Sequence, residues 1–266
     1  MTAFYIKSFL FILGSCLGSF CNVLIHRSTS ENPKDQSILG RSRCPHCGYF
    51  INPKDLIPLI SFLILRGRCR SCGHTLTGRY WIVELILGLV SMQLYPLVLF
   101  GDVIGFVLWM TLSMGLVTLF FTDYEKGLLP DMIQIPLFLF FWIGTAWIDP
   151  YPFSRMSTGL ISAVLGWCLI WFLSRLYFIF RHQEGFGGGD GKMLAWIGVF
   201  YEWRSMLGIF FLATILGTLW GILLKIQRKG PWNMELPFGS LLAVSAAIMA
   251  LWGDRLGRFY LESVIS

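Results

Sequence analysis

The feature that most constrains this chain is a series of apolar segments, each about 20 residues long, separated by short polar stretches. A helix of that length crosses the hydrocarbon of a bilayer. Hydrophobic residues make up 55% of the chain and charged residues only 14%, which is too apolar for an ordinary soluble domain. We therefore predict an all-α polytopic membrane protein.

Seven helices are expected directly from these segments, covering residues 4–25, 81–99, 103–121, 133–148, 158–180, 206–224 and 236–252. The apolar stretch 193–201 is too short to span straight through, so it is either a tilted span extended by its neighbours or a re-entrant piece. We predict about eight transmembrane helices. The first is counted as a retained span, because it lacks the basic start of a secretory signal.

Charge placement predicts the orientation of these spans. Between residues 26 and 79 lie nine Lys or Arg against three acids, and this excess of six equals the net charge of the whole chain. Short loops rich in Lys and Arg stay cytoplasmic, so we expect this segment inside the cell. Topology and anionic lipid headgroups explain the positive charge next to a membrane, so nucleic acid is not an expected partner.

Two Cys-x-x-Cys pairs lie in this basic segment, with Gly48 and Gly73 directly after them; the four cysteines are Cys44, Cys47, Cys69 and Cys72. The spacing is typical of a zinc ribbon, whose four thiolates close a tetrahedral shell and leave no open position for catalysis. Disulfides are the alternative, but the expected compartment is reducing. We predict a structural zinc site, with His46 and His74 exposed to solvent. The remaining cysteines are expected to be packing residues inside spans: Cys16, Cys21 and Cys168.

Two acids stand at expected cytoplasmic ends of spans. Asp123 ends the third span, and Asp190 follows three glycines ahead of Lys192. Two carboxylates brought together can share a proton and activate water, and a glycine run lets a substrate backbone approach closely. A phosphate-binding loop does not fit the glycine spacing. The residues alone leave open that both aspartates cap helices or balance Lys126 and Lys192, and they favour Asp131 as a helix cap or first-turn acid. Glu84, early in the second span, is expected to pair with Arg79 or Arg27.

In this order the motifs resemble the bacterial type IV prepilin peptidases, which are also called leader peptidases and N-methyltransferases. The similarity rests on residues 18–27, 44–48, 57–61, 66–73, 79–80 and 83–85, on Asp123 seven residues before Pro130, and on the Gly-x-Gly-Asp run that ends at Asp190.

This resemblance implies that Asp123 and Asp190 are the catalytic pair of a membrane aspartyl endopeptidase. The enzyme would remove the basic leader of a type IV prepilin or a type II secretion pseudopilin at the cytoplasmic face of the inner membrane. It also implies N-methylation of the new N-terminus from S-adenosylmethionine, for which Gly67 and Arg68 are candidate residues. The expected domains are a first transmembrane helix at 1–25, a four-cysteine zinc-ribbon-like domain at 26–80 and a peptidase domain at 81–266.

Two other hypotheses remain to be separated from proteolysis. A non-catalytic zinc-ribbon membrane assembly factor would need its cysteines and not its aspartates. A proton-coupled transporter is disfavoured, because the key acids are expected at one membrane face and not near the midplane.

Overall fold

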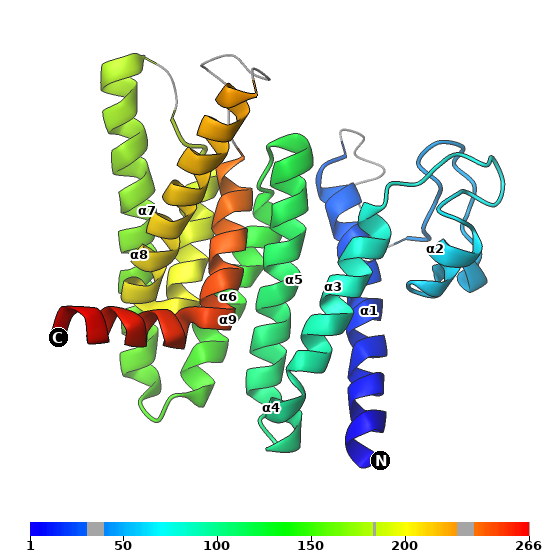
Figure 1. Ribbon diagram of the computed structural model, residues 1–266, viewed down its shortest axis with the longest axis horizontal. Helices are drawn as coiled ribbons and strands as arrows, with labels where there is room; N and C mark the ends of the chain where they lie inside the picture. Colours follow the sequence, from blue (N-terminus) through cyan, green and yellow to red (C-terminus); the bar gives the residue numbers. More distant parts are fainter. Residues whose placement is uncertain (31–39, 183–184, 228–236, 266) are drawn as a thin grey trace. The chain divides into compact units, whose positions relative to one another are not determined.

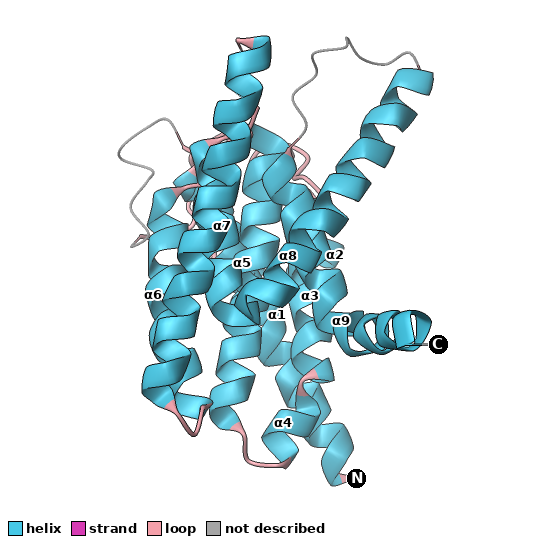
Figure 2. Cartoon of the chain, turned by 90° about the vertical axis from the view of Figure 1, so that its left-hand side faces the viewer, coloured by secondary structure: helices cyan, strands magenta, loops and turns pink. Residues whose placement is uncertain are grey.

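The computed structural model describes residues 1–30, 40–182, 185–227 and 237–265. Every regular element in these residues is a helix, and two isolated β-bridges, at Arg43 with Phe50 and at Arg68 with Thr75, lie in the cysteine-bearing loops (Figure 2). The elements are α1 (Thr2–Ser28), η1 (Pro53–Leu56), α2 (Ile60–Ile64), α3 (Arg79–Gln93), α4 (Tyr95–Leu99), α5 (Val103–Lys126), α6 (Asp131–Ile148), α7 (Pro152–Arg181), α8 (Gly188–Ile226) and α9 (Phe238–Ile265).

Four of the helices in the described residues, α1, α5, α7 and α8, are long and apolar enough to cross a membrane. Two shorter apolar stretches, Asp131–Trp147 and Phe238–Gly253, lie in α6 and α9. The all-α, multi-span fold class is thus confirmed, while the number of eight spans stays a prediction. The expected helix 81–99 is divided into α3 and α4, because Pro96 lacks the N–H that would continue the helix.

Helix α8 turns back on itself at Glu202, where the backbone has φ 63° and ψ 166°. A Cβ on Gly198 would lie 2.8 Å from the sulfur of Met206, whereas eight residues of straight helix separate two positions by about 12 Å. The segment 193–201 is therefore the end of a short helix that begins at Gly188. Its length falls under a full bilayer crossing, so the tilted span extended by its neighbours and the re-entrant piece both stay predictions.

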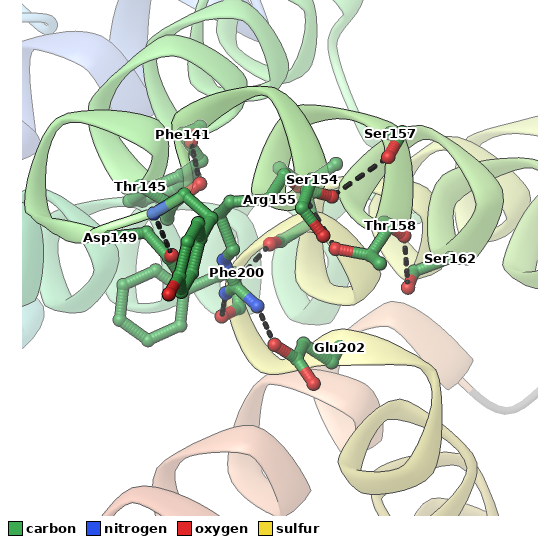
Figure 3. Close-up of polar contacts among 12 residues, drawn as sticks. Phe141, Thr145, Asp149, Ser154, Arg155, Ser157, Thr158, Ser162, Phe200 and Glu202 are labelled. Atoms are coloured by element: carbon green, nitrogen blue, oxygen red, sulfur yellow. Dashed lines mark hydrogen bonds and ion pairs between the residues drawn. The ribbon is translucent and has the colours of Figure 1, made fainter.

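Arg155, near the start of α7, holds this turn (Figure 3). Its guanidinium donates to the carbonyl oxygen of Phe200 at 2.9 Å and pairs with the carboxylate of Glu202. These bonds satisfy a carbonyl left free where the first part of α8 ends.

The chain divides into two compact units, Met1–Thr118 and Leu119–Ser266. In the first unit α1 packs along α3 (Figure 1). Glycines allow the close approach: a Cβ on Gly14 would lie 2.3 Å from the carbonyl oxygen of Leu87, and one on Gly18 would lie 2.7 Å from Cα of Glu84. Small residues spaced four apart are typical of closely packed membrane helices. Of the three cysteines expected in spans, Cys21 is buried as a packing residue, whereas Cys16 and Cys168 are exposed.

In the second unit the first part of α8 lies among α6, α7 and α9. Trp196 is fully buried there and stacks on Phe141 of α6, with ring centroids 5.7 Å apart. On the α7 side, a Cβ on Gly166 would lie 3.1 Å from the carbonyl oxygen of Leu194. This packing fixes the helix that carries Asp190 from several sides.

Candidate active site and metal centre

Asp123 lies in the last turn of α5 and faces the first turn of α9. Its Oδ2 accepts two hydrogen bonds from Ser240, from the backbone N–H at 2.6 Å and from the hydroxyl at 3.0 Å. The first N–H groups of a helix have no partner within the helix, so a carboxylate from another element is stabilised there. Asp123 is only 6% exposed, and a buried acid so placed has a defined orientation.

Asp190 is the third residue of α8 and is also 6% exposed. Its Oδ2 accepts the backbone N–H of Gly187 at 3.0 Å, while its own N–H donates to the carbonyl of Gly187 at 3.1 Å. These reciprocal bonds begin the helix and fix the carboxylate against its own backbone.

The two carboxylates belong to one site, because their charges interact electrostatically. Leu129 packs against Gly189, the neighbour of Asp190, because a Cβ on Gly189 would lie 2.7 Å from Cβ of Leu129. It also packs against Gly239, where a Cβ would lie 2.8 Å from Cδ1 of Leu129 and 3.1 Å from Cγ of Asp123. In each aspartate Oδ2 is held by backbone N–H, and Oδ1 accepts no hydrogen bond from the described residues. One oxygen of each acid is thus left for water or substrate.

Helix capping explains part of the arrangement of the two aspartates. Charge balance between Asp190 and Lys192 does not explain it. Both aspartates do accept N–H groups at helix starts, as the alternative reading expected. Lys192, however, pairs with Asp131 at 2.6 Å and not with Asp190. Asp131 itself is the first residue of α6, which confirms it as a first-turn acid. Neither role explains why two buried acids meet in one place.

The four cysteines of the two pairs converge in the first unit, where their sulfur atoms all lie within 4.8 Å of one another. The edge of a tetrahedral zinc–thiolate shell is about 3.8 Å, and the sulfurs of Cys44 and Cys72 are 4.0 Å apart. Backbone N–H groups of Cys72 and Ser71 lower the pKa of the Cys69 thiol to about 7. Against the backbone N–H of His74, burial and the neighbouring thiols raise the pKa of Cys72 to about 11. The thiolate that metal binding requires therefore forms first at Cys69. The cluster can therefore hold a metal ion.

The two knuckles have the same local geometry, twenty-five positions apart in the sequence. Gly48 N donates to the carbonyl of Cys44, and Gly73 N donates to that of Cys69, both at 2.9 Å. Both glycines have φ of 69°, a conformation that favours glycine. His46 and His74 are exposed as predicted, and their rings stack at 4.3 Å.

Sequence reasoning missed Gly239 and Ser240, which lie at the start of α9, Ser240 117 residues from Asp123. A Pro-Phe-Gly-Ser run before an apolar segment is a signal for a helix start, and it could have drawn attention to the free N–H groups there. Glu84 was expected to pair with Arg79 or Arg27; its Oε2 accepts the backbone N–H of Leu59 at 2.7 Å.

The fold and the site define a multi-span membrane protein with a buried aspartate pair and a four-cysteine cluster. Residues 12–97 match the family described as Bacterial Peptidase A24 N-terminal domain, and residues 110–222 match the Type IV leader peptidase family. The chain belongs to the type IV leader peptidase family.

Three curated relatives carry the name prepilin leader peptidase/N-methyltransferase. The relative from Aeromonas hydrophila is 33% identical over 97% of this chain and 94% of its own length. Those from Pseudomonas aeruginosa and Myxococcus xanthus are 31% and 37% identical, over 94% and 84% of this chain and 92% and 65% of their own lengths. No solved structure matches the chain significantly.

Proposed function

We propose that this protein is a membrane aspartyl endopeptidase that removes the leader from a prepilin or a type II secretion pseudopilin, and that it then N-methylates the new N-terminus. The observation that carries the peptidase activity is the meeting of Asp123 and Asp190, both buried and each held by backbone N–H through one oxygen. The names of the relatives support the substrate class and the second activity.

The geometry supports acid–base catalysis by the pair. Two adjacent carboxylates share one proton, so one of them can take a proton from water while the other gives a proton to the departing amide nitrogen. The free Oδ1 atoms are the groups that water and the scissile peptide would meet. Ser240 and Gly187 hold the remaining oxygens, which keeps both carboxylates oriented during the reaction.

The positive charge of residues 26–79 supports a cytoplasmic site in the bacterial inner membrane. Asp123 lies at the end of its apolar helix and Asp190 at the start of α8, so both acids belong to a membrane boundary. A prepilin that keeps its apolar helix in the bilayer would present its leader junction at that level.

We assign zinc to the four-cysteine cluster on the spacing of its sulfurs and the paired knuckles. Four protein thiolates complete a tetrahedral shell, so the metal would support the loop fold and take no part in the cleavage. The hypothesis of a zinc-ribbon assembly factor shares this metal site, but it gives no role to the aspartate pair.

Replacing Asp123 or Asp190 with Asn tests the peptidase. Asn keeps the size of the side chain and can still accept a hydrogen bond, but it cannot carry the proton. We expect cleavage of purified prepilin to fall by at least about 10²–10⁴-fold in either variant, with zinc content unchanged. Asp149, in the loop after α6, provides the control Asp149→Asn. Normal cleavage by both active-site variants would exclude the aspartyl mechanism and favour the assembly factor.

A further inference from the structure

The first unit contains a cavity of about 400 Å³ that the peptidase reaction does not use. It is lined by the end of α1, the start of α3, the short helices η1 and α2, and the loops of the cysteine-bearing segment. Pockets that hold small ligands or cofactors usually measure about 300–1,000 Å³. Its size therefore fits a single cofactor-sized molecule.

The N-terminal motifs singled out in the sequence converge on this cavity. They come from three stretches far apart in the chain, and the lining residues that matter here are Ser19, Asn22, Gly67, Arg68, Tyr80 and Glu84. Asn22 ties two of these stretches together, because its side-chain N–H donates to the carbonyl of Tyr80 at 3.0 Å. The candidate residues Gly67 and Arg68 are thus part of a built site.

Asn22 also leaves one acceptor unused. The residue is 2% exposed, and its Oδ1 has no hydrogen-bond partner among the described residues. The atom has less than 1 Å² of accessible surface, so a ligand meets it when the cavity wall shifts slightly. Because an unsatisfied buried acceptor costs free energy, a ligand donor at this atom would stabilise that shift.

Glu84 brings a buried carboxyl group to the same wall, being only 8% exposed. Asp55, the other carboxylate of the lining, is held by Arg70 at 2.6 Å, and that hydrogen bond lowers the pKa of Asp55. Glu84 instead accepts hydrogen bonds from Leu59 N–H and from the side chain of Ser19. Leu59 has φ of 62°, unfavourable for leucine, so the bond to Glu84 also holds the loop above the cavity.

S-adenosylmethionine fits this set of groups. Its sulfonium and ammonium are cations that a buried carboxylate attracts, and its carboxylate is matched by the guanidinium group of Arg68. Its amino groups can donate to Asn22 Oδ1. Phe62 and Leu76 give the cavity an apolar wall for the adenine. When bound, the molecule supplies an activated methyl group.

We propose that this cavity is the methyl-donor site, in which Glu84 binds a positive centre of S-adenosylmethionine and Asn22 Oδ1 accepts a hydrogen bond from it. The inference rests on the proposed function, from which the methyl donor follows. In the transfer an N–C bond forms at the pilin amine and the S–C bond breaks, its electron pair staying on sulfur as a thioether. The amine nitrogen gives up one proton to solvent.

The test is direct binding of isotope-labelled S-adenosylmethionine to the full-length, zinc-loaded protein in detergent. Glu84→Gln removes the charge but keeps an oxygen that can accept Leu59 N–H, so the loop stays anchored. Asn22→Leu removes the free acceptor at similar size. We expect each variant to bind roughly tenfold or more weakly, while Glu84→Gln still cleaves prepilin at the parent rate. Asp149→Asn and Asp190→Asn should bind as the parent does.

The outcomes separate this inference from the peptidase. Unchanged binding in both Glu84→Gln and Asn22→Leu would overturn the site, even if cleavage proceeds normally. So would a parent protein that binds no S-adenosylmethionine and instead retains an anionic phospholipid through purification. Loss of cleavage with intact S-adenosylmethionine binding in Asp190→Asn, and the reverse in Glu84→Gln, supports both proposals, because each activity then depends on its own site.

Discussion

Two neighbouring glycines precede Asp190, and we expect their alanine variants to differ in the rate of cleavage. The Cβ that Gly189→Ala would add lies 2.7 Å from Cβ of Leu129, whereas a Cβ on Gly188 meets nothing within 4 Å. Non-bonded carbon atoms settle at about 3.5–4.0 Å. Because the atom in the way is a Cβ and not a flexible chain end, the first turn of α8 must move by about 1 Å in Gly189→Ala.

That movement acts directly on Asp190, the next residue. A misplacement of about 1 Å in an active site costs about 10²-fold in rate, which corresponds to roughly 2.7 kcal/mol of barrier height. Helix propensity does not separate the two variants, because both replace Gly with Ala in the first turn of α8. We expect Gly188→Ala to cleave prepilin near the parent rate and Gly189→Ala to cleave about a hundredfold more slowly.

The assay is the initial rate of leader removal from purified prepilin in detergent, with product masses measured to separate cleavage from methylation. Asp190→Asn sets the background. Parent-like cleavage by Gly189→Ala would mean that Leu129 does not pack on α8 in the active enzyme. An equal hundredfold loss in Gly188→Ala would also refute the argument from packing against Leu129. That result would mean that the substrate backbone lies against both glycines.

Two further predictions concern the turn of α8 and the metal. Glu202 occupies backbone angles that are nearly restricted to glycine. Glu202→Gly and Glu202→Ala both lose the ion pair with Arg155, so the glycine variant should be more stable than the alanine variant by about 1–3 kcal/mol. Thermal unfolding in detergent measures this difference, and equal midpoints would contradict it. Metal analysis should find one zinc per chain in the parent and in His46→Ala, but almost none in Cys44→Ser or Cys69→Ser. Zinc lost in the histidine variant would contradict a shell of four thiolates.

The sequence predicted what is determined locally. The knuckle around Cys44 repeats around Cys69 because spacing, a glycine and a few backbone bonds define each turn, and these lie within six residues. Helix positions followed from apolar segments for a similar reason: inside a bilayer a backbone must satisfy its own hydrogen bonds, so apolar length alone indicates a helix. Asp131 as a first-turn acid is a prediction of the same kind.

Contacts between distant segments could not be predicted in this way. Nothing near Asp123 indicates Ser240, and nothing near Lys192 indicates that its partner is Asp131 and not Asp190. The turn at Glu202 could not be predicted either, because a glutamate gives no local signal for a positive φ. Its conformation is held by a tertiary contact with Arg155. The pairing of Asp123 with Asp190 was expected from the family resemblance, and by residue type alone it could not be told from capping.

Under the proposed function the two sites act on one atom in a fixed order. In an intact prepilin the nitrogen at the leader junction belongs to a peptide bond, whose lone pair is delocalised into the carbonyl and is a poor nucleophile. Cleavage by Asp123 and Asp190 converts it to an amine, and only then can it attack a methyl group. A free α-amino group has a pKa of about 7.7–8.0, so near neutral pH it must first lose a proton. Peptide cleavage therefore creates the substrate of the methyl transfer, which explains why one chain would carry both an aspartate pair and a separate cofactor-sized cavity.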